Sequence, residues 1–322
     1  MVFLRLKSDM KCWKGFMVLA CMLCCAGVAR AQFDVHFTHY WALQSYYNPA
    51  MAGASGRMNV MGTYSMQMAG YTNAPATMLV AADYALPTER KEHNFQAGLL
   101  SDKIGLFNNQ RMFAGYAYRT NLWGGKFAAG VSAGMVSQTF DGSKVEAEEK
   151  SDPALPSSSI DGEAFDLGAG LSYTNDLFYL GLAAMHLTAP ELELGETNSM
   201  KINRSFIFDG GCNIQLKNPL LSIQPSVQLM TNLLSWRADI TARGTYSYDG
   251  KKYYAGLTYS PMTSVAILLG GEINSITFGY AYELFTSGVG LIYGSHDLFV
   301  GYVMDLDLFK KGKNKHKSVR IL

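Results

Sequence analysis

Few residues of this chain have the type and spacing that chemistry requires. His36 and His39 form an H-x-x-H pair, a candidate for metal binding, but no helical pattern and no third ligand lie nearby in the sequence. The motifs of a phosphate-binding loop, a dinucleotide-binding turn and a nucleophile elbow are all missing from it. These patterns indicate a protein that is not an enzyme and that holds neither a metal nor another cofactor.

The segment 141–163 is a second candidate for ligand binding because it gathers seven Asp and Glu residues against two lysines. Carboxylates bind Ca²⁺, yet a calcium loop spaces them in a pattern such as D-x-D-x-D-G, which this segment lacks. A solvated acidic loop is the preferred interpretation, with a calcium site as the alternative.

The elements that must position these residues are β-strands, and the stretch from Trp236 to Tyr246 is their template. Its even positions are apolar or small, whereas its odd positions are Arg, Asp and Thr. Because a strand turns successive side chains to opposite faces, one face of this segment is apolar and the other is charged. Trp236 and Tyr246 end the apolar face, and aromatic rings favour the lipid–water interface.

The same alternation recurs from Arg57 onward, with turn residues between the segments. No apolar run after the first thirty residues approaches the roughly 18–20 residues of a membrane helix, so a membrane location requires a closed barrel. We therefore predict an all-β fold, a transmembrane antiparallel β-barrel of about 14 strands over residues 57–309, with an N-terminal periplasmic segment. The predicted strands are 58–68, 76–85, 94–102, 107–118, 126–140, 164–174, 177–187, 203–216, 220–231, 235–247, 251–260, 263–271, 275–284 and 296–308.

The connections between these strands differ in length on the two sides of the predicted barrel. If the chain enters strand 1 from the periplasm, short turns such as 175–176, 217–219 and 248–250 lie on the periplasmic side. The longest connections (141–163, 188–202 and 285–295) then all lie on the outer side. Short periplasmic turns with long outer loops are typical of outer-membrane barrels.

Residues 1–31 have the pattern of a Sec signal peptide. A basic start (Arg5 to Lys14) precedes an apolar stretch from Gly15 to Val28, and Ala29-Arg30-Ala31 fits a cleavage site before Gln32. The alternative is a lipoprotein signal that ends at Cys21. Cleavage after Ala31 removes four of the five cysteines, so Cys212 would remain as a small apolar filler without a disulfide.

The charge of the mature chain is acidic in its body and basic at its end. Residues 1–31 hold five of the 27 basic and one of the 26 acidic residues, which leaves 22 basic and 25 acidic. Six of those 22 lie in a predicted periplasmic tail, 310–322, which contains no acidic residue. This balance disfavours nucleic-acid binding. The tail is either a solvated extension or a contact for anionic lipid or an acidic periplasmic partner.

Residues 32–56 show no strand alternation but many aromatic residues, and we interpret them as an N-terminal plug or docking segment. The candidate residues for docking a partner are Phe37, Tyr40, Tyr47, Asn48, Pro49 and Gly53. Their rings would anchor the segment and the Asn-Pro pair would make a rigid turn. The alternative is that the segment only covers the periplasmic mouth of the barrel for stability.

Two blocks of this segment resemble the start of the PorP/SprF family of type IX secretion system outer-membrane proteins. They are Asp34-Val35-His36-Phe37-Thr38-His39-Tyr40 and Tyr46-Tyr47-Asn48-Pro49-Ala50-Met51-Ala52-Gly53. The block Gly294-Ser295-His296-Asp297 also resembles a family pattern, so the similarity brackets the mature chain.

The resemblance implies a non-enzymatic β-barrel in the outer membrane of a Bacteroidetes-type bacterium. Its expected partners are outer-membrane lipid and either type IX components (the periplasmic ring or peptidoglycan-linked lipoproteins) or a neighbouring secreted adhesin. A passive porin or small-substrate channel is the alternative function. An outer-membrane hydrolase is a third class, for which His186 and His296 lie near outer strand ends, but no nucleophile can be tied to either one.

Overall fold

The computed structural model describes residues 34–71, 73–87, 91–144, 158–195, 198–286 and 293–305. The predicted signal peptide, most of the acidic loop and the basic tail lie outside these residues. Among the residues that are described, no helix is both long enough and apolar enough to cross a membrane.

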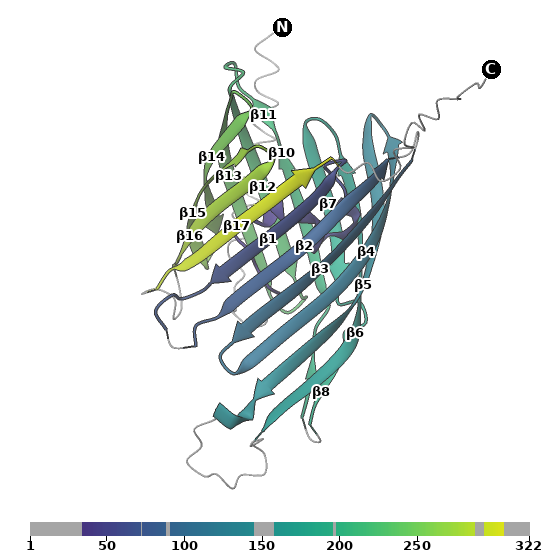
Figure 1. The fold of residues 1–322 in the computed structure, drawn as a ribbon, viewed down its shortest axis with the longest axis vertical. Coiled ribbons are helices and arrows are strands. Elements are labelled where there is room, and N and C mark those ends of the chain that lie inside the picture. The colour runs from purple at the N-terminus through teal and green to yellow at the C-terminus, as the bar shows by residue number, and fades with distance from the viewer. Residues whose placement is uncertain are drawn as a thin grey trace, which may run out of the picture.

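The described chain forms one antiparallel sheet that closes on itself into a barrel (Figure 1). The first strand pairs with the last, with Met58 opposite Met304, and the remaining seam is closed by β10 against β12. β10 and β11 flank Asn213 and are two parts of one strand. The described barrel therefore has fourteen strands, as the alternation predicts. The barrel strands are β1 (Met58–Met66), β2 (Ala76–Pro87), β3 (Lys91–Ile104), β4 (Phe107–Leu122), β5 (Gly125–Asp141), β6 (Ser159–Thr174), β7 (Phe178–Met185), β10 (Ser205–Cys212), β11 (Ile214–Gln215), β12 (Leu221–Thr231), β13 (Trp236–Tyr248), β14 (Lys251–Ser260), β15 (Ser264–Ile273), β16 (Ile276–Phe285) and β17 (Ser295–Met304).

The two faces of the template strand are oriented as its pattern predicts. In β13 the side chains of Asp239 and Thr241 are buried inside the barrel, whereas Ile240 and Tyr246 are 51% and 41% exposed on the outside. Large apolar side chains cover the outer face of the other strands in the same way. This outer face is the surface that meets lipid.

We name the two ends of the barrel by their connections. The turn rim joins β2–β3, β4–β5, β6–β7, β11–β12, β13–β14 and β15–β16, and the loop rim carries the other connections. Three turns on the turn rim have two residues with positive φ, namely Trp123-Gly124, Asp249-Gly250 and Asn274-Ser275. This conformation suits two-residue hairpins whose strands keep the normal twist.

The wall is taller on one side of the barrel, as Figure 1 shows. β4, β5 and β6 have 16, 17 and 16 residues, whereas β14 to β17 have 10 each. Since about 9–11 residues suffice for a tilted strand to cross the hydrocarbon layer, the tall wall extends past it at the loop rim. The predicted loop 141–163 is therefore shorter than expected, because β6 begins at Ser159.

A hairpin at the loop rim was not predicted from the sequence. β8 (Glu191–Leu194) and β9 (Asn198–Lys201) pair within the connection that the alternation pattern leaves as a loop, 188–202. Leu192 and Leu194 are buried while Glu191 and Glu193 face solvent. Four-residue strands are too short for such a pattern to stand out from the surrounding sequence.

Candidate functional site

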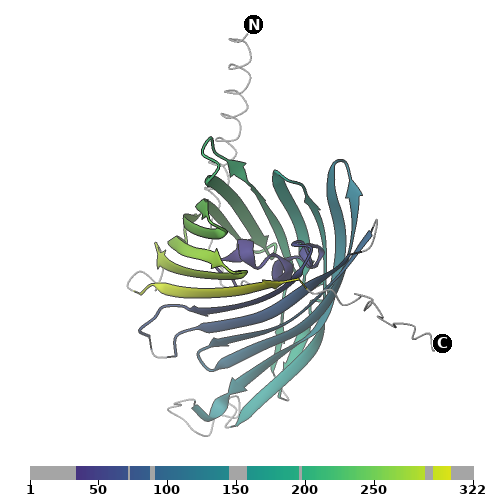
Figure 2. The same cartoon turned by 45° about the horizontal axis from the view of Figure 1, so that its top comes forward.

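The segment before β1 lies inside the barrel. It contains three short helices, η1 (Tyr40–Ala42), α2 (Gln44–Tyr47) and η2 (Pro49–Met51), drawn in purple within the lumen in Figure 2. Its apolar side chains, of which Phe37 and Leu43 are fully buried, belong to the buried apolar core and pack there against wall residues such as Met61 and Phe113. We call residues 34–56 the lumenal segment.

The lumenal segment runs along the barrel from the loop rim to the turn rim. At its start Asp34 contacts His186, which follows the loop-rim end of β7. Near its end Gly53 contacts Asp83, close to the turn-rim end of β2. The sequence predicts an N-terminal periplasmic segment that acts as a plug or docking element, and its described residues lie within the lumen.

The Asn48-Pro49-Ala50 turn is bound to the tall wall by its amide side chain. Asn48 Nδ2 donates to the backbone oxygens of Leu171 in β6 and Leu182 in β7, at 3.1 and 3.3 Å. Its Oδ1 accepts from the backbone N–H of Ala50 at 3.0 Å and so caps η2, which begins at Pro49. Because Asn48 is fully buried, each of these hydrogen bonds satisfies a group that water does not reach.

Glycines in the wall make room for this turn. A Cβ added at Gly170 in β6 would lie 2.0 Å from Asn48 Oδ1, and one at Gly130 in β5 would lie 2.6 Å from the backbone N of Ala50. Gly130 and Gly170 are paired across the β5–β6 ladder. The wall therefore has a smooth patch where the backbone of the lumenal segment approaches it closely.

Two charged side chains of the wall hold the end of the lumenal segment. The guanidinium of Arg119 in β4 donates to the backbone oxygens of Gly53, Ala52 and Ala50 at 2.7, 3.0 and 3.4 Å. Asp83 in β2 accepts from the backbone N–H of Gly53 at 3.0 Å. Gly53 has φ +64°, and a Cβ there would be 2.4 Å from Asn94 Oδ1, so glycine is required on both counts.

The middle of the lumenal segment is bound to the opposite wall. The hydroxyl of Tyr40 lies 3.0 Å from Ser226 Oγ in β12 and donates to Thr241 Oγ1 in β13 at 3.0 Å. The backbone N–H of Thr38 donates to Asp297 in β17 at 2.8 Å. Contacts to β2, β4, β6, β7, β12, β13 and β17 thus surround the segment.

His36 and His39 do not share a ligand position. His36 Nε2 lies 3.2 Å from Asp239 in β13, whereas His39 stacks on Phe299 in β17, with ring centroids 5.8 Å apart. The His39 ring is fully buried, and neither of its nitrogens has a hydrogen-bond partner among the described residues. Within the described ranges, no group of three His, Cys, Asp or Glu side chains is placed to hold a metal ion.

At the loop-rim end an ion-pair chain fastens the start of the lumenal segment. Asp34 Oδ1 lies 2.9 Å from His186 Nε2, and Asp166 Oδ2 lies 3.0 Å from His186 Nδ1 and 3.2 Å from Arg111 Nε. Burial alone would lower the pKa of His186, but the two carboxylates outweigh it and raise the pKa to about 9. Burial likewise opposes the charge of Asp34, yet His186 keeps the pKa of Asp34 below its ordinary value.

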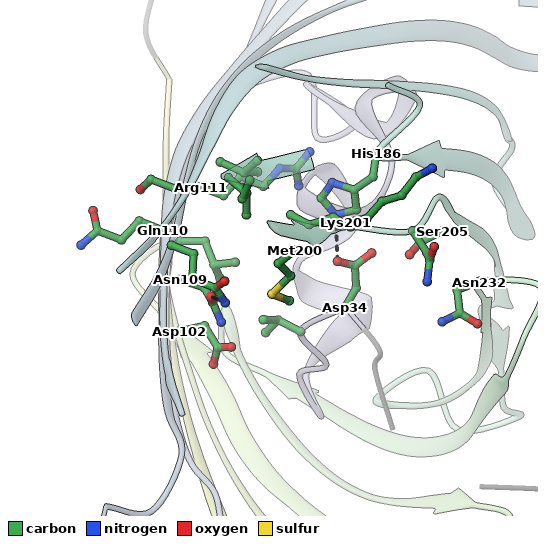
Figure 3. Close-up of a pocket in the computed structure, with 18 of the residues that line it drawn as sticks. Asp34, Asp102, Asn109, Gln110, Arg111, His186, Met200, Lys201, Ser205 and Asn232 are labelled. Atoms are coloured by element: carbon green, nitrogen blue, oxygen red, sulfur yellow. Dashed lines mark hydrogen bonds and ion pairs between the residues drawn. The ribbon is translucent and has the colours of Figure 1, made fainter. Parts of the chain in front are cut away.

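Beside this chain is a cavity of about 150 Å³ (Figure 3). Arg111 and Gln138 line it from the tall wall, Asp34 from the lumenal segment, and Leu192 and Met200 from the β8–β9 hairpin. The hairpin therefore covers the cavity on the loop-rim side.

All six residues that the sequence nominates for partner docking lie in the lumen. Phe37, Tyr40, Tyr47, Asn48 and Pro49 are buried, and Gly53 is buried at the turn-rim end. Their contacts are to the barrel and to one another; for example, the backbone N–H of Phe37 donates to the hydroxyl of Tyr47 at 3.0 Å. Whether any of them also contacts a partner stays a prediction.

The wall residues that bind the segment were not predicted. Arg111, Arg119, Asp83 and Asp166 are charged side chains on inward positions of long strands, and inward charge alone is ordinary in a barrel lumen. His186 was noted only as a histidine near an outer strand end. His296 lies 2.8 Å from the Tyr280 hydroxyl at an exposed position.

A family model matches residues 29–302, and it describes a type IX secretion system membrane protein, PorP/SprF. The chain belongs to the PorP/SprF family. The match includes the whole lumenal segment and nearly all of the barrel, so this PorP/SprF protein is an outer-membrane β-barrel of the type IX secretion system. A search of curated proteins finds none that matches the chain.

Solved structures similar to this PorP/SprF protein include three outer-membrane barrels. A Pseudomonas aeruginosa FadL homologue is 11% identical with a TM-score of 0.47, covering 79% of this chain and 92% of its own. The CymD monoaromatic hydrocarbon channel is 10% identical with a TM-score of 0.48, covering 86% and 95%. A triple mutant of the Rhodopseudomonas blastica porin is 9% identical with a TM-score of 0.33, covering 77% and 99%.

Proposed function

We propose that this PorP/SprF protein is a non-enzymatic component of the type IX secretion system that supports export or surface attachment of secreted proteins by docking a partner. Family membership over residues 29–302 is the observation that carries the proposal. The partner is a type IX component at the periplasmic face, such as the ring or a peptidoglycan-linked lipoprotein, or a neighbouring adhesin. The turn rim faces the periplasm in this account, because the barrel's first strand, β1, begins at this rim and its last strand, β17, ends there.

A passive porin is the second candidate, and the lumenal segment disfavours it. A porin needs a continuous aqueous path, whereas here residues 34–53 cross the lumen and bind strands on opposite sides. Large side chains of the segment, including Tyr40 and Tyr47, are about 1% exposed. A channel would therefore require the segment to leave.

We assign partner docking to the exposed end of the lumenal segment. Ala54, Ser55 and Gly56 are exposed and lie just before β1, at the turn rim. In this account the six nominated residues hold the segment in place, so that its exposed end is presented to the partner in one conformation. The tail 310–322, which lies outside the described residues, would follow β17 on the same side.

Deletion of the gene tests the secretion role. The deletion strain should stop exporting either all proteins that bear type IX C-terminal signals or one adhesin encoded nearby, and the wild-type gene should restore export. Proteomics of the culture medium and of surface-shaved cells measures this. Unchanged secretion together with reduced uptake of small solutes would instead support the porin.

Site-specific crosslinking tests the docking surface. A photo-crosslinking residue in place of Ser55 should capture a type IX component or an adhesin, and the same residue in place of buried Tyr47 should capture only this chain. Capture of lipid alone from Ser55 and from its neighbours Ala54 and Gly56 would contradict docking at the turn rim.

A further inference from the structure

The cavity beneath the β8–β9 hairpin contains polar atoms that lack partners. Among the described residues, Nη1 of Arg111 and Oδ2 of Asp34 are buried without a hydrogen-bond partner, as is Oε1 of Gln138. Arg111 is 6% exposed, so water in bulk does not replace the missing bond. A buried guanidinium nitrogen without an acceptor is costly, which makes a cavity at this position a candidate binding site.

The cations around the cavity favour an acidic ligand. Arg111, His186 and Lys201 all line it, and Lys201 is exposed, so the cavity reaches solvent beside β9 (Figure 3). The neighbouring carboxylates are Asp34, Asp102 and Asp166. The charges of these three cations and three carboxylates cancel while Asp34 is in place. When Asp34 moves away, the group has a net charge of +1.

Asp34 is the carboxylate that can leave. Asp166 and Asp102 belong to the strands β6 and β3, and Asp102 accepts from Thr77 Oγ1 at 2.6 Å. Asp34 instead lies at the start of the lumenal segment, and its contact with His186 at 2.9 Å is the ion pair that fastens this end. Arg119 and Asn48 hold the other end of the segment independently.

We propose that Arg111, His186 and Lys201 form a carboxylate-binding site, whose His186 is paired in the structure with Asp34 as an internal ligand. A carboxylate from outside, carried by the C-terminal residue of a peptide or by a small organic acid, binds in its place. Guanidinium and imidazolium groups bind carboxylates by charge-assisted hydrogen bonds, and Arg111 has an unused donor for one. The cavity of about 150 Å³ has the volume of an engineered cavity known to hold benzene, so it takes one small residue.

Displacement of Asp34 frees the start of the lumenal segment, while His36, Thr38 and Tyr40 keep its middle bound to the opposite wall. The site would therefore couple an acidic ligand to the position of the segment's start at the loop rim. This inference does not depend on the secretion role.

The test uses a cysteine in the releasable part of the segment. Val35, next to Asp34, is half-buried and packs against the core, so Val35→Cys in a Cys212→Ser background should react with a water-soluble maleimide more slowly than an exposed thiol does. The probes are N-acetylalanine, its amide N-acetylalaninamide, and acetate, each added to the full-length protein in detergent. N-acetylalanine at roughly ten times its dissociation constant should raise the labelling rate severalfold, towards that of an exposed thiol, whereas the amide should not.

The two acids distinguish the sources of the carboxylate. An effect of N-acetylalanine alone assigns the site to a peptide end, and an equal effect of acetate assigns it to small acids. Labelling that neither acid accelerates, or that the amide accelerates equally, would overturn the proposal.

Substitutions of the lining residues supply the controls. Lys201→Gln should remove most of the acid effect, and because Lys201 is exposed the variant should fold normally. Lys251→Gln, an exposed lysine at the turn rim, should leave the effect intact. Asp34→Asn should raise labelling without any ligand. If Lys201→Gln and Lys251→Gln respond to N-acetylalanine alike, the carboxylate site is wrong.

Discussion

Asn48 illustrates how much of this protein depends on single polar side chains in its lumen. Its amide satisfies two strand carbonyls and caps η2, while Arg119 binds the carbonyl oxygens of Ala50, Ala52 and Gly53 in the same turn region. The Asn-Pro-Ala-x-Ala-Gly block was identified from the sequence as a rigid turn. The wall residue that binds this turn, Arg119, was not identified, because the sequence around an inward Arg in a strand does not tell which backbone it will contact.

The close approach of this turn to Gly170 gives a prediction at one residue. Gly170→Ala should lower the free energy of unfolding by about 1–3 kcal/mol, because its Cβ would overlap Asn48 Oδ1 and force the turn away from β6. Gly244→Ala in β13 is the matched control, since a Cβ there meets nothing within 4 Å. Urea unfolding in detergent measures both, and equal stability of the two variants would contradict the packing described for Asn48.

His186 predicts a dependence of stability on pH. Its pKa is raised from 6.5 to about 9 in the folded protein, so the protonated ring stabilises the fold fully below pH 6.5. As pH rises from 6.5 through about 9, this stabilisation, roughly 3 kcal/mol, should be lost. Unfolding free energies between pH 6 and pH 10 measure the slope, and His186→Asn should flatten it. A variant with an unchanged slope would exclude His186 as its source.

At the scale of elements, the lumenal segment differs most from what the sequence suggested. Its aromatic residues were identified as anchors, which agrees with their burial. The sequence left open whether they plug the lumen or cover the periplasmic mouth, because a segment without periodicity carries no information on which surface covers it. The barrel strands were predictable for the opposite reason: lipid outside and a polar lumen inside impose a two-residue period on every strand.

Burial of the lumenal segment in the barrel should shield its residues from reagents dissolved in water. In a Cys212→Ser background, Ser45→Cys should react slowly with a water-soluble maleimide, because Ser45 is 5% exposed and donates to Asp83 at 3.0 Å. Ser55→Cys, which is exposed and only ten positions away, should react at the rate of an unhindered thiol. Mass spectrometry of the labelled protein gives both rates. Similar rates at the two positions would mean that the segment does not remain in the lumen.

At the scale of the whole molecule, the barrel is closed in two ways. The ladder closes the wall by pairing β1 with β17, and the lumenal segment closes the interior by binding both sides of it. The number of strands and the lipid face followed from alternation in the sequence. The start of β6 at Ser159 and the β8–β9 hairpin did not follow from it, because both lie in stretches interpreted as loops, and four-residue strands are too short for their alternation to stand out.

Single-channel recording in a planar bilayer tests the central claim, that residues 34–53 fill the lumen of a closed barrel, most directly. The full-length protein should show no steady conductance, and a variant that lacks residues 34–53, checked for folding by its heat-dependent shift on a gel, should conduct. Steady conductance of the full-length protein, equal to that of the deletion variant, would contradict the account.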